Sequence, residues 1–119
     1  MVTAAFQGDL GKPRPAVILQ ADECIEDHVT LLLCPFSTFL TDAAIFRPTV
    51  VPSPENGLQA TSQIMVDKMT HLRKPAIGRV IGRLNDDEMQ RLEAAVIAIT
   101  GLRQSVLPIA GLQHLGEQQ

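Results

Sequence analysis

Aromatic residues are scarce in this 119-residue chain, which has four phenylalanines and neither tryptophan nor tyrosine. Proteins that bind single strands without sequence preference stack successive bases on aromatic side chains. The composition therefore argues against such a stacking platform. Cysteine is also scarce, because Cys24 and Cys34 are the only two. Neither has a Cys or His partner at zinc-finger spacing, and two are too few for a disulfide framework. We expect a cytoplasmic protein with reduced thiols, in which Cys34 is a small core residue.

Strong charge and long apolar runs are missing as well. The formal net charge is −3 at pH 7, which as an average argues against a polybasic nucleic-acid binder. No apolar run approaches the roughly 18 residues of a membrane span, and the first residues do not resemble a signal peptide. The hydrophobic content of 45% is too high for a disordered chain. These features predict one globular domain that is not inserted in a membrane.

Short apolar runs separated by Gly, Pro and Asp predict a mainly β chain. Residues 29–34 are almost continuously apolar, which favours a strand buried on both faces and ended by Pro35. Pro48 cannot donate to a ladder, so its strand should be at an edge or carry a bulge. The predicted strands cover residues 2–6, 15–20, 29–34, 45–51, 62–67 and 77–84.

One helix is predicted over residues 86–100. Asn85 is a good N-cap, and Glu88 has the spacing of a capping box. Gly101 follows the last turn, where a glycine commonly ends a helix. Several short strands and one late helix are typical of a small barrel with a helix packed on it. The predicted apolar stripe of this helix consists of Met89, Leu92, Val96 and Ile99.

Half of the basic residues lie within residues 68–83, a stretch without Asp or Glu. Such a stretch could attract phosphates. It could equally be a solvated face of the protein. The residues concerned are Lys68, Arg73, Lys74, Arg79 and Arg83.

The most informative segment is residues 11–20, Gly-Lys-Pro-Arg-Pro-Ala-Val-Ile-Leu-Gln. Two prolines stiffen the backbone on both sides of Arg14 at the start of an apolar strand. A guanidinium held in this way can bind a phosphate with two hydrogen bonds. The alternative is a structural arginine that braces the loop against a carboxylate.

These features together resemble the MazF/PemK toxin family, bacterial endoribonucleases of toxin–antitoxin pairs. Residues 11–20 are similar to its first signature, and Cys-Pro-Phe-Ser-Thr at residues 34–38 is similar to the second. Residues 62–68 and 81–88 are similar to the third. The likeness covers about residues 2–102 in order and spacing.

The resemblance implies a mainly β SH3-like barrel of the CcdB/PemK type, with a closing helix and a homodimeric assembly. It implies a toxin that cleaves single-stranded RNA at specific sequences without a metal or other cofactor. In that family a ribose 2′-hydroxyl attacks its own phosphodiester. The resemblance also implies a cognate antitoxin. We expect the barrel domain to span residues 1–102, followed by a flexible extension at residues 103–119.

Catalytic roles carried over from the family fall on Arg14 and on Ser37, or on Thr38 with a shift of one residue. Arginine is a poor general base because its pKa exceeds 12, so Arg14 is expected to clamp the phosphate electrostatically. The family's usual Thr is Ser37 here, which keeps the hydroxyl, and a common Gln is Phe39. The expected RNA contacts are Lys12, Phe39, Ser62, Asp67 and Lys68.

Other functions stay open on the sequence alone. A CcdB-like toxin could bind DNA gyrase with the same fold, and an inactive barrel could simply bind a partner. The Arg14 signature and the Ser37 hydroxyl favour RNA cleavage. A histidine pair such as His28 and His71 could also cleave RNA without a metal. The acidic residues at positions 86 and 87 are explained by helix capping, so no metal site is predicted there.

Overall fold

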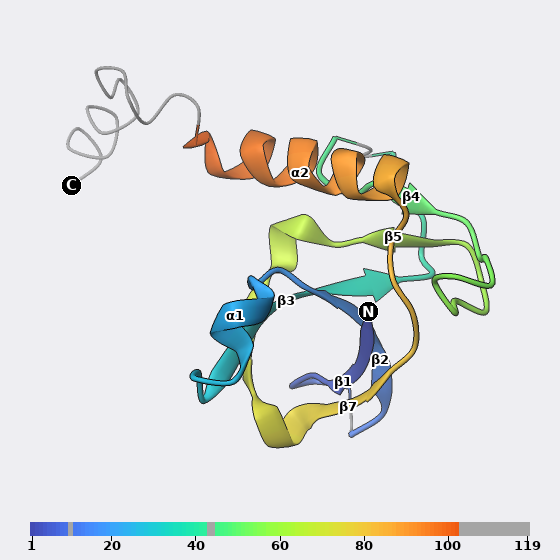
Figure 1. Ribbon diagram of the computed structural model, residues 1–119. Coiled ribbons are helices and arrows are strands. Elements are labelled where there is room, and N and C mark those ends of the chain that lie inside the picture. Colours follow the sequence, from blue (N-terminus) through green and yellow to red (C-terminus); the bar gives the residue numbers. More distant parts are fainter. Residues whose placement is uncertain (10, 43–44, 103–119) are drawn as a thin grey trace.

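The computed structural model describes residues 1–9, 11–42 and 45–102. A curved antiparallel sheet carries a long C-terminal helix across one side (Figure 1). None of the helices in these ranges is long and apolar enough to cross a membrane. The elements in chain order are β1 (Val2–Ala5), β2 (Pro13–Ile18), α1 (Asp22–Ile25), β3 (Thr30–Ser37), β4 (Thr49–Val50), β5 (Ser62–Ile64), η1 (Val66–Lys68), β6 (Thr70–Arg73), η2 (Lys74–Ala76), β7 (Ile77–Val80) and α2 (Asp86–Thr100).

The sheet curves into a ring, in which β6 and β7 are connected by the covalent chain through η2 and not by strand pairing. Strand β3 pairs with β2 along one edge and with β6 and β5 along the other. Strand β1 joins β2 to β7, and β6 runs on into β7 through η2. Within the described residues, β4 and β7 end the hydrogen-bonded order, so backbone pairing does not close the barrel. The predicted mainly β fold with a C-terminal helix is confirmed.

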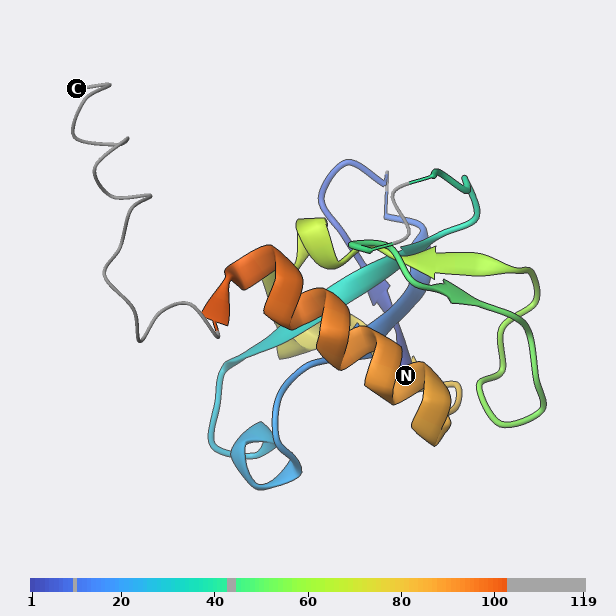
Figure 2. The ribbon, with the colours of Figure 1, turned by 90° about the horizontal axis from the view of Figure 1, so that it is seen from above.

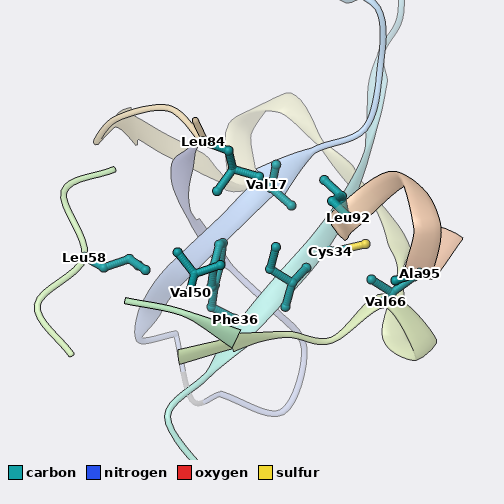
Figure 3. Packing of buried hydrophobic residues seen from close by; sticks show 10 residues of the cluster. Val17, Cys34, Phe36, Val50, Leu58, Val66, Leu84, Leu92 and Ala95 are labelled. Atoms are coloured by element: carbon teal, nitrogen blue, oxygen red, sulfur yellow. The ribbon is translucent and has the colours of Figure 1, made fainter. Parts of the chain in front are cut away.

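Two apolar clusters lie on opposite faces of β3, because successive strand residues point to opposite sides. Leu31 and Leu33 belong to the cluster inside the ring. Cys34 and Phe36 belong to the cluster between the sheet and α2, shown in Figure 3. The prediction of a strand buried on both faces is confirmed. Cys34 is fully buried, as predicted, and burial raises the pKa of its thiol to about 12, with the charge of Asp67 adding a smaller effect.

The prediction that Pro35 ends this strand is wrong. Strand β3 continues to Ser37, and Pro35 faces Ala16 of β2. Proline has no amide proton, but its carbonyl accepts a hydrogen bond from the Met65 amide at 2.8 Å. Pro48 lies where expected, beside the edge strand β4, although that strand is much shorter than predicted. Strand β6 was not predicted.

Helix α2 begins and ends as predicted. Asn85 Oδ1 accepts from the Glu88 amide at 2.7 Å, and Glu88 Oε1 accepts from the Asn85 amide at 2.9 Å. Gly101 ends the helix in the left-handed region, at a φ of 63°. The helix crosses the sheet obliquely (Figure 2). The predicted apolar stripe is only partly right, because Met89 and Ile99 are 41% and 38% exposed. Leu92 of the stripe is buried and Val96 is half-buried, and the other buried positions of the helix are Glu88 and Ala95.

Candidate functional site

A pocket of about 550 Å³ collects side chains from separate parts of the sheet. Arg14 comes from the start of β2, Ser37 is the last residue of β3, and Thr38 follows it. Residues 57–60 form another wall, and Arg79 of β7 also lines the pocket. The extension of β3 beyond Pro35 carries Ser37 to this place. The structure thus brings together the three residues predicted to be catalytic.

Arg14 is held by two groups. Its Nε and Nη2 atoms each lie 2.8 Å from an oxygen of the Asp9 carboxylate, and Nη1 donates to the Phe36 carbonyl at 3.3 Å. The Asp9 backbone accepts from the Lys12 amide at 3.0 Å and donates to the Phe6 carbonyl at 3.2 Å. Hydrogen bonds within the described residues use two of the five guanidinium N–H groups, one on Nη1 and one on Nη2, while Nε and Asp9 Oδ2 form a close ion pair without hydrogen-bond geometry. One donor on Nη1 and one on Nη2 are left for a ligand.

Asp9 is a residue that the sequence reasoning missed. Both interpretations of Arg14 hold at once, because the arginine braces the loop against a carboxylate and also lines the pocket. The available signal was an acidic residue inside the Gly/Pro-rich loop, five positions before Arg14. The ion pair, the Nη2 hydrogen bond to Asp9 and the Nη1 hydrogen bond to the Phe36 carbonyl together hold the guanidinium in place.

Ser37 and Thr38 lie at the start of a turn that is held by hydrogen bonds to its backbone. Ser37 Oγ accepts from the Phe39 amide at 3.1 Å. Farther along, the buried Gln63 side chain accepts from the Thr41 amide and donates to the Thr41 carbonyl, each at 2.9 Å. Thr38 is exposed at the tip of this turn. The Ser37 oxygen is therefore held in position, and its hydroxyl donates to the Phe39 carbonyl over a long 3.5 Å contact that a bound phosphate oxygen would have to displace.

The residues predicted to contact RNA are only partly gathered here. Phe39 is 76% exposed and lines the Arg14 pocket. Ser62 lines it too, but is only 3% exposed and donates to the Ala60 carbonyl at 2.8 Å. Lys68 lines a second pocket of about 220 Å³, which also includes Arg14. Lys12 is exposed on the loop before β2 and lines neither pocket.

Asp67 lies outside both of these pockets. Its two oxygens each accept from Arg47, from Nε and Nη2, at 3.0 Å. This pairing, chiefly through its hydrogen bonds, holds the pKa of Asp67 below its ordinary value of 3.8. Asp67 is consequently a charged carboxylate at neutral pH, with both oxygens already engaged. This pair was not predicted, because its two members are 20 residues apart in the chain.

Comparison with known proteins identifies the family of the chain. The family described as PemK-like, MazF-like toxins of type II toxin–antitoxin systems matches residues 1–100. The chain belongs to this family. The probable endoribonuclease MazF of Mycolicibacterium smegmatis is 35% identical over 101 residues, which are 84% of this chain and 92% of that protein.

Solved structures resemble this PemK/MazF-like toxin in fold. The Mycobacterium tuberculosis toxin MazF-mt6 has a TM-score of 0.69 at 23% identity, covering 82% of this chain and 94% of that one. An endoribonuclease in complex with its cognate antitoxin, from a mycobacterial species, has a TM-score of 0.68 at 17% identity. That match covers 85% of this chain and 91% of the other.

In this PemK/MazF-like chain the basic stretch of residues 68–83 does not form one patch. Lys68 and Arg79 line the two pockets that include Arg14. Lys74 donates instead to the Glu26 carbonyl at 3.0 Å, and Arg83 lines a third pocket near Met1. The stretch divides because β6, η2 and β7 change direction around the ring.

The histidine alternative has no geometric support in the described residues. His28 and His71 are both exposed, and neither lines a pocket with Arg14. His114 and the predicted extension at residues 103–119 lie outside the described residues. Within the ranges that the structure describes, no group of three His, Cys, Asp or Glu side chains is placed to hold a metal ion.

Proposed function

We propose that this PemK/MazF-like toxin is a sequence-specific endoribonuclease that cleaves single-stranded RNA in the Arg14 pocket without a metal ion. The observation that carries the proposal is the arrangement around Arg14. The Arg14 guanidinium is held by Asp9 and the Phe36 carbonyl and keeps N–H donors available for a ligand. It lines the same pocket as the hydroxyl side chains of Ser37 and Thr38. The related MazF of M. smegmatis, named a probable endoribonuclease, supports the same activity.

The proposed reaction is an internal transfer of the phosphodiester. The ribose 2′-oxygen loses its proton and bonds to the adjacent phosphorus, while the bond from phosphorus to the 5′-oxygen breaks. The 5′-oxygen takes up a proton, so the products are a 2′,3′-cyclic phosphate and a 5′-hydroxyl. Negative charge grows on the nonbridging oxygens in the transition state, where fixed N–H and O–H donors are most effective. Arg14 and the Ser37 hydroxyl are the donors that we assign to this role.

The two adjoining pockets suggest how the RNA lies. Because Arg14 belongs to both, a strand that crosses it has nucleotides on either side of the reacting phosphate. Lys68 on one side and Arg79 on the other are placed to attract the flanking phosphates. Lys12 adds positive charge at the exposed loop. With so few aromatic residues, Phe39 is the side chain available in the first pocket for stacking on a base.

We also propose that the toxin is a cytoplasmic homodimer that is held by a cognate antitoxin. The fold is shared with solved MazF toxins, including an endoribonuclease described in complex with its cognate antitoxin. An extended acidic segment of the antitoxin would compete with RNA for the Arg14 pocket. Sedimentation of the purified toxin should give twice the chain mass of 12.9 kDa. A monomer at micromolar concentration would contradict the dimer.

Cleavage in the presence of excess EDTA tests the function itself. We expect the wild-type toxin to cut single-stranded RNA into fragments with a cyclic phosphate and a 5′-hydroxyl, because no step is assigned to a metal. The same oligonucleotide with 2′-deoxyribose at the cleavage site should stay intact. If the RNA also survives, the proposed function is wrong. Inhibition of DNA gyrase by the same preparation would then favour the CcdB-like alternative.

Ser37 and Thr38 can be separated by matched substitutions. Ser37→Ala should lower kcat about 10²-fold, the usual effect of removing one oxyanion donor. Thr38→Ala should change kcat by less than about threefold, because Thr38 is exposed at the turn and Ser37 is the anchored hydroxyl. Ser37→Thr keeps a hydroxyl and should restore most of the activity. Initial cleavage rates measure all three, and a larger loss for Thr38→Ala would reverse the assignment.

A further inference from the structure

Behind one wall of the Arg14 pocket lies a buried carboxamide that no step of the reaction uses. Asn56 is fully buried. Its Oδ1 accepts from the amides of Ser53 and Leu58, each at 3.0 Å. Its Nδ2 donates to the Val51 carbonyl at 2.9 Å and to Glu88 Oε2 at 3.5 Å. One side chain thus fixes the backbone of its own loop at three points and also reaches helix α2.

The contact with Glu88 connects the loop to a rigid element. Glu88 is itself buried and closes the capping box at the start of α2. The loop is also pressed against the chain after β7. A Cβ atom on Gly57, whose φ is +70°, would collide with the Ile81 carbonyl, and one on Gly82 would collide with the Glu55 carbonyl. The loop is therefore clamped from both sides, without room for a side chain between the two segments.

The wall of the pocket begins directly after this clamp. Residues 57–60 line the pocket, and Leu58 at their start receives one of the Asn56 hydrogen bonds. Within this segment Gln59 is exposed, and its amide has both donors and acceptors for the edge of a base. Ser37 and Thr38 line the same pocket from the end of β3 and the turn after it, which Gln63 supports through Thr41. The Asn56 hydrogen bonds act on residues 57–60 and make no direct contact with Ser37 or Thr38. Strand β5 joins the two lining segments, because Ser62 donates to the Ala60 carbonyl and Gln63 pairs with Ser37.

We propose that Asn56 is a positioning residue for substrate specificity, which acts by holding the wall of residues 57–60 against the base beside the cleaved phosphate. The proposal rests on the proposed function, since it assumes that RNA enters this pocket. A wall that reads a base by hydrogen bonds rejects the wrong base because its polar groups are then left unpaired. That rejection requires a fixed wall. A mobile wall adjusts to several bases, while Arg14 and Ser37 continue to act on the phosphate.

The test compares sequence preference with turnover. Asn56→Asp preserves the shape but removes both Nδ2 donations and sets a carboxylate beside Glu88. Ser53→Ala is a milder change, since Ser53 Oγ accepts from the Asn56 amide at 3.2 Å. Each variant is incubated with a pool of RNA oligonucleotides carrying a randomised centre, and the cleaved ends are sequenced. We expect preference at one position beside the cut to fall by about tenfold in Asn56→Asp, and less in Ser53→Ala. At the preferred site, KM should rise more than kcat falls.

Leu92→Ala is the control for loss of stability alone. Leu92 of α2 is buried in the cluster between the sheet and this helix, and it lines neither of the two pockets that contain Arg14. It should lower the fraction of folded protein and leave the sequence preference unchanged. If wild-type toxin cleaves and both loop variants keep the wild-type preference, Asn56 has no positioning role. If Leu92→Ala relaxes the RNA sequence preference as much as the loop variants do, the effect reflects a general loss of stability and the inference is overturned. Wild-type toxin that leaves the pool intact overturns the proposed function, and this inference with it.

Discussion

Replacing Arg14 with alanine is expected to lower the rate of RNA cleavage about 10³-fold, within the range seen for a single arginine or oxyanion donor in phosphoryl and acyl transfer. The reason is that Arg14 is the fixed cation at the junction of the two pockets. Its removal deprives the developing charge of two donors and leaves Asp9 as an unpaired carboxylate. Single-turnover cleavage of a labelled oligonucleotide in EDTA measures the effect without interference from product release.

Arg14→Lys is the matched variant for this result. Lysine keeps the charge but has no planar fork, so it cannot pair with both Asp9 oxygens and bind a phosphate in a fixed orientation. We expect it to recover only a small part of the lost rate. The circular dichroism of both variants should match that of the wild type. If folded Arg14→Ala retains more than a tenth of the wild-type rate, the phosphate clamp must be another residue.

The largest effect on stability is expected for Phe36→Ala, which should lower the free energy of unfolding by about 3–5 kcal/mol. Phe36 is 2% exposed and belongs to the cluster between the sheet and α2. Phe39 is three positions away and 76% exposed. Phe39→Ala is therefore expected to change the free energy of unfolding by no more than about 0.5 kcal/mol. Urea denaturation followed by circular dichroism compares the two substitutions directly.

The two phenylalanines should also separate in their effect on activity. If Phe39 stacks on a base, Phe39→Ala should raise KM while leaving the protein fully folded, since one stacking contact is worth about 1–3 kcal/mol. Phe36→Ala should instead lose activity mainly through the unfolded fraction, with a further loss because its side chain lines the Arg14 pocket. Equal stability losses for both would show that Phe39 packs against the protein in solution.

Features carried by local sequence were predictable in this chain. The capping box of α2 depends on residues three positions apart, and both of its hydrogen bonds are present. The two-faced burial of β3 follows from its apolar run. The end of the same strand was mispredicted because proline was treated as a stop signal, although its carbonyl still pairs with Met65. The buried face of α2 was predicted only in part, because Glu88 is buried against Asn56, which lies 32 residues away in the chain.

The candidate site shows the same division. Arg14 was found because two prolines and an apolar strand mark it locally, and Ser37 because a family signature surrounds it. Asp9 and Gln63 were not predicted, because the role of each depends on a partner, Arg14 or Thr41, that only the fold brings near. The basic stretch was misleading for the opposite reason. Its charges are adjacent in sequence, but in the fold Lys68 and Arg79 line pockets with Arg14, whereas Lys74 donates to the Glu26 carbonyl and Arg83 lines a pocket near Met1.

The ion pair between Arg14 and Asp9 also bears on how RNA arrives. Together the two side chains carry no net charge, so at a distance they exert little pull on a polyanion. Long-range steering must then come from cations outside the pair, among them Lys12, Lys68 and Arg79. Different residues therefore attract the RNA and act on its phosphodiester. Added salt should slow capture of the substrate, because exposed charges are screened, while the rate of the bound complex stays nearly constant.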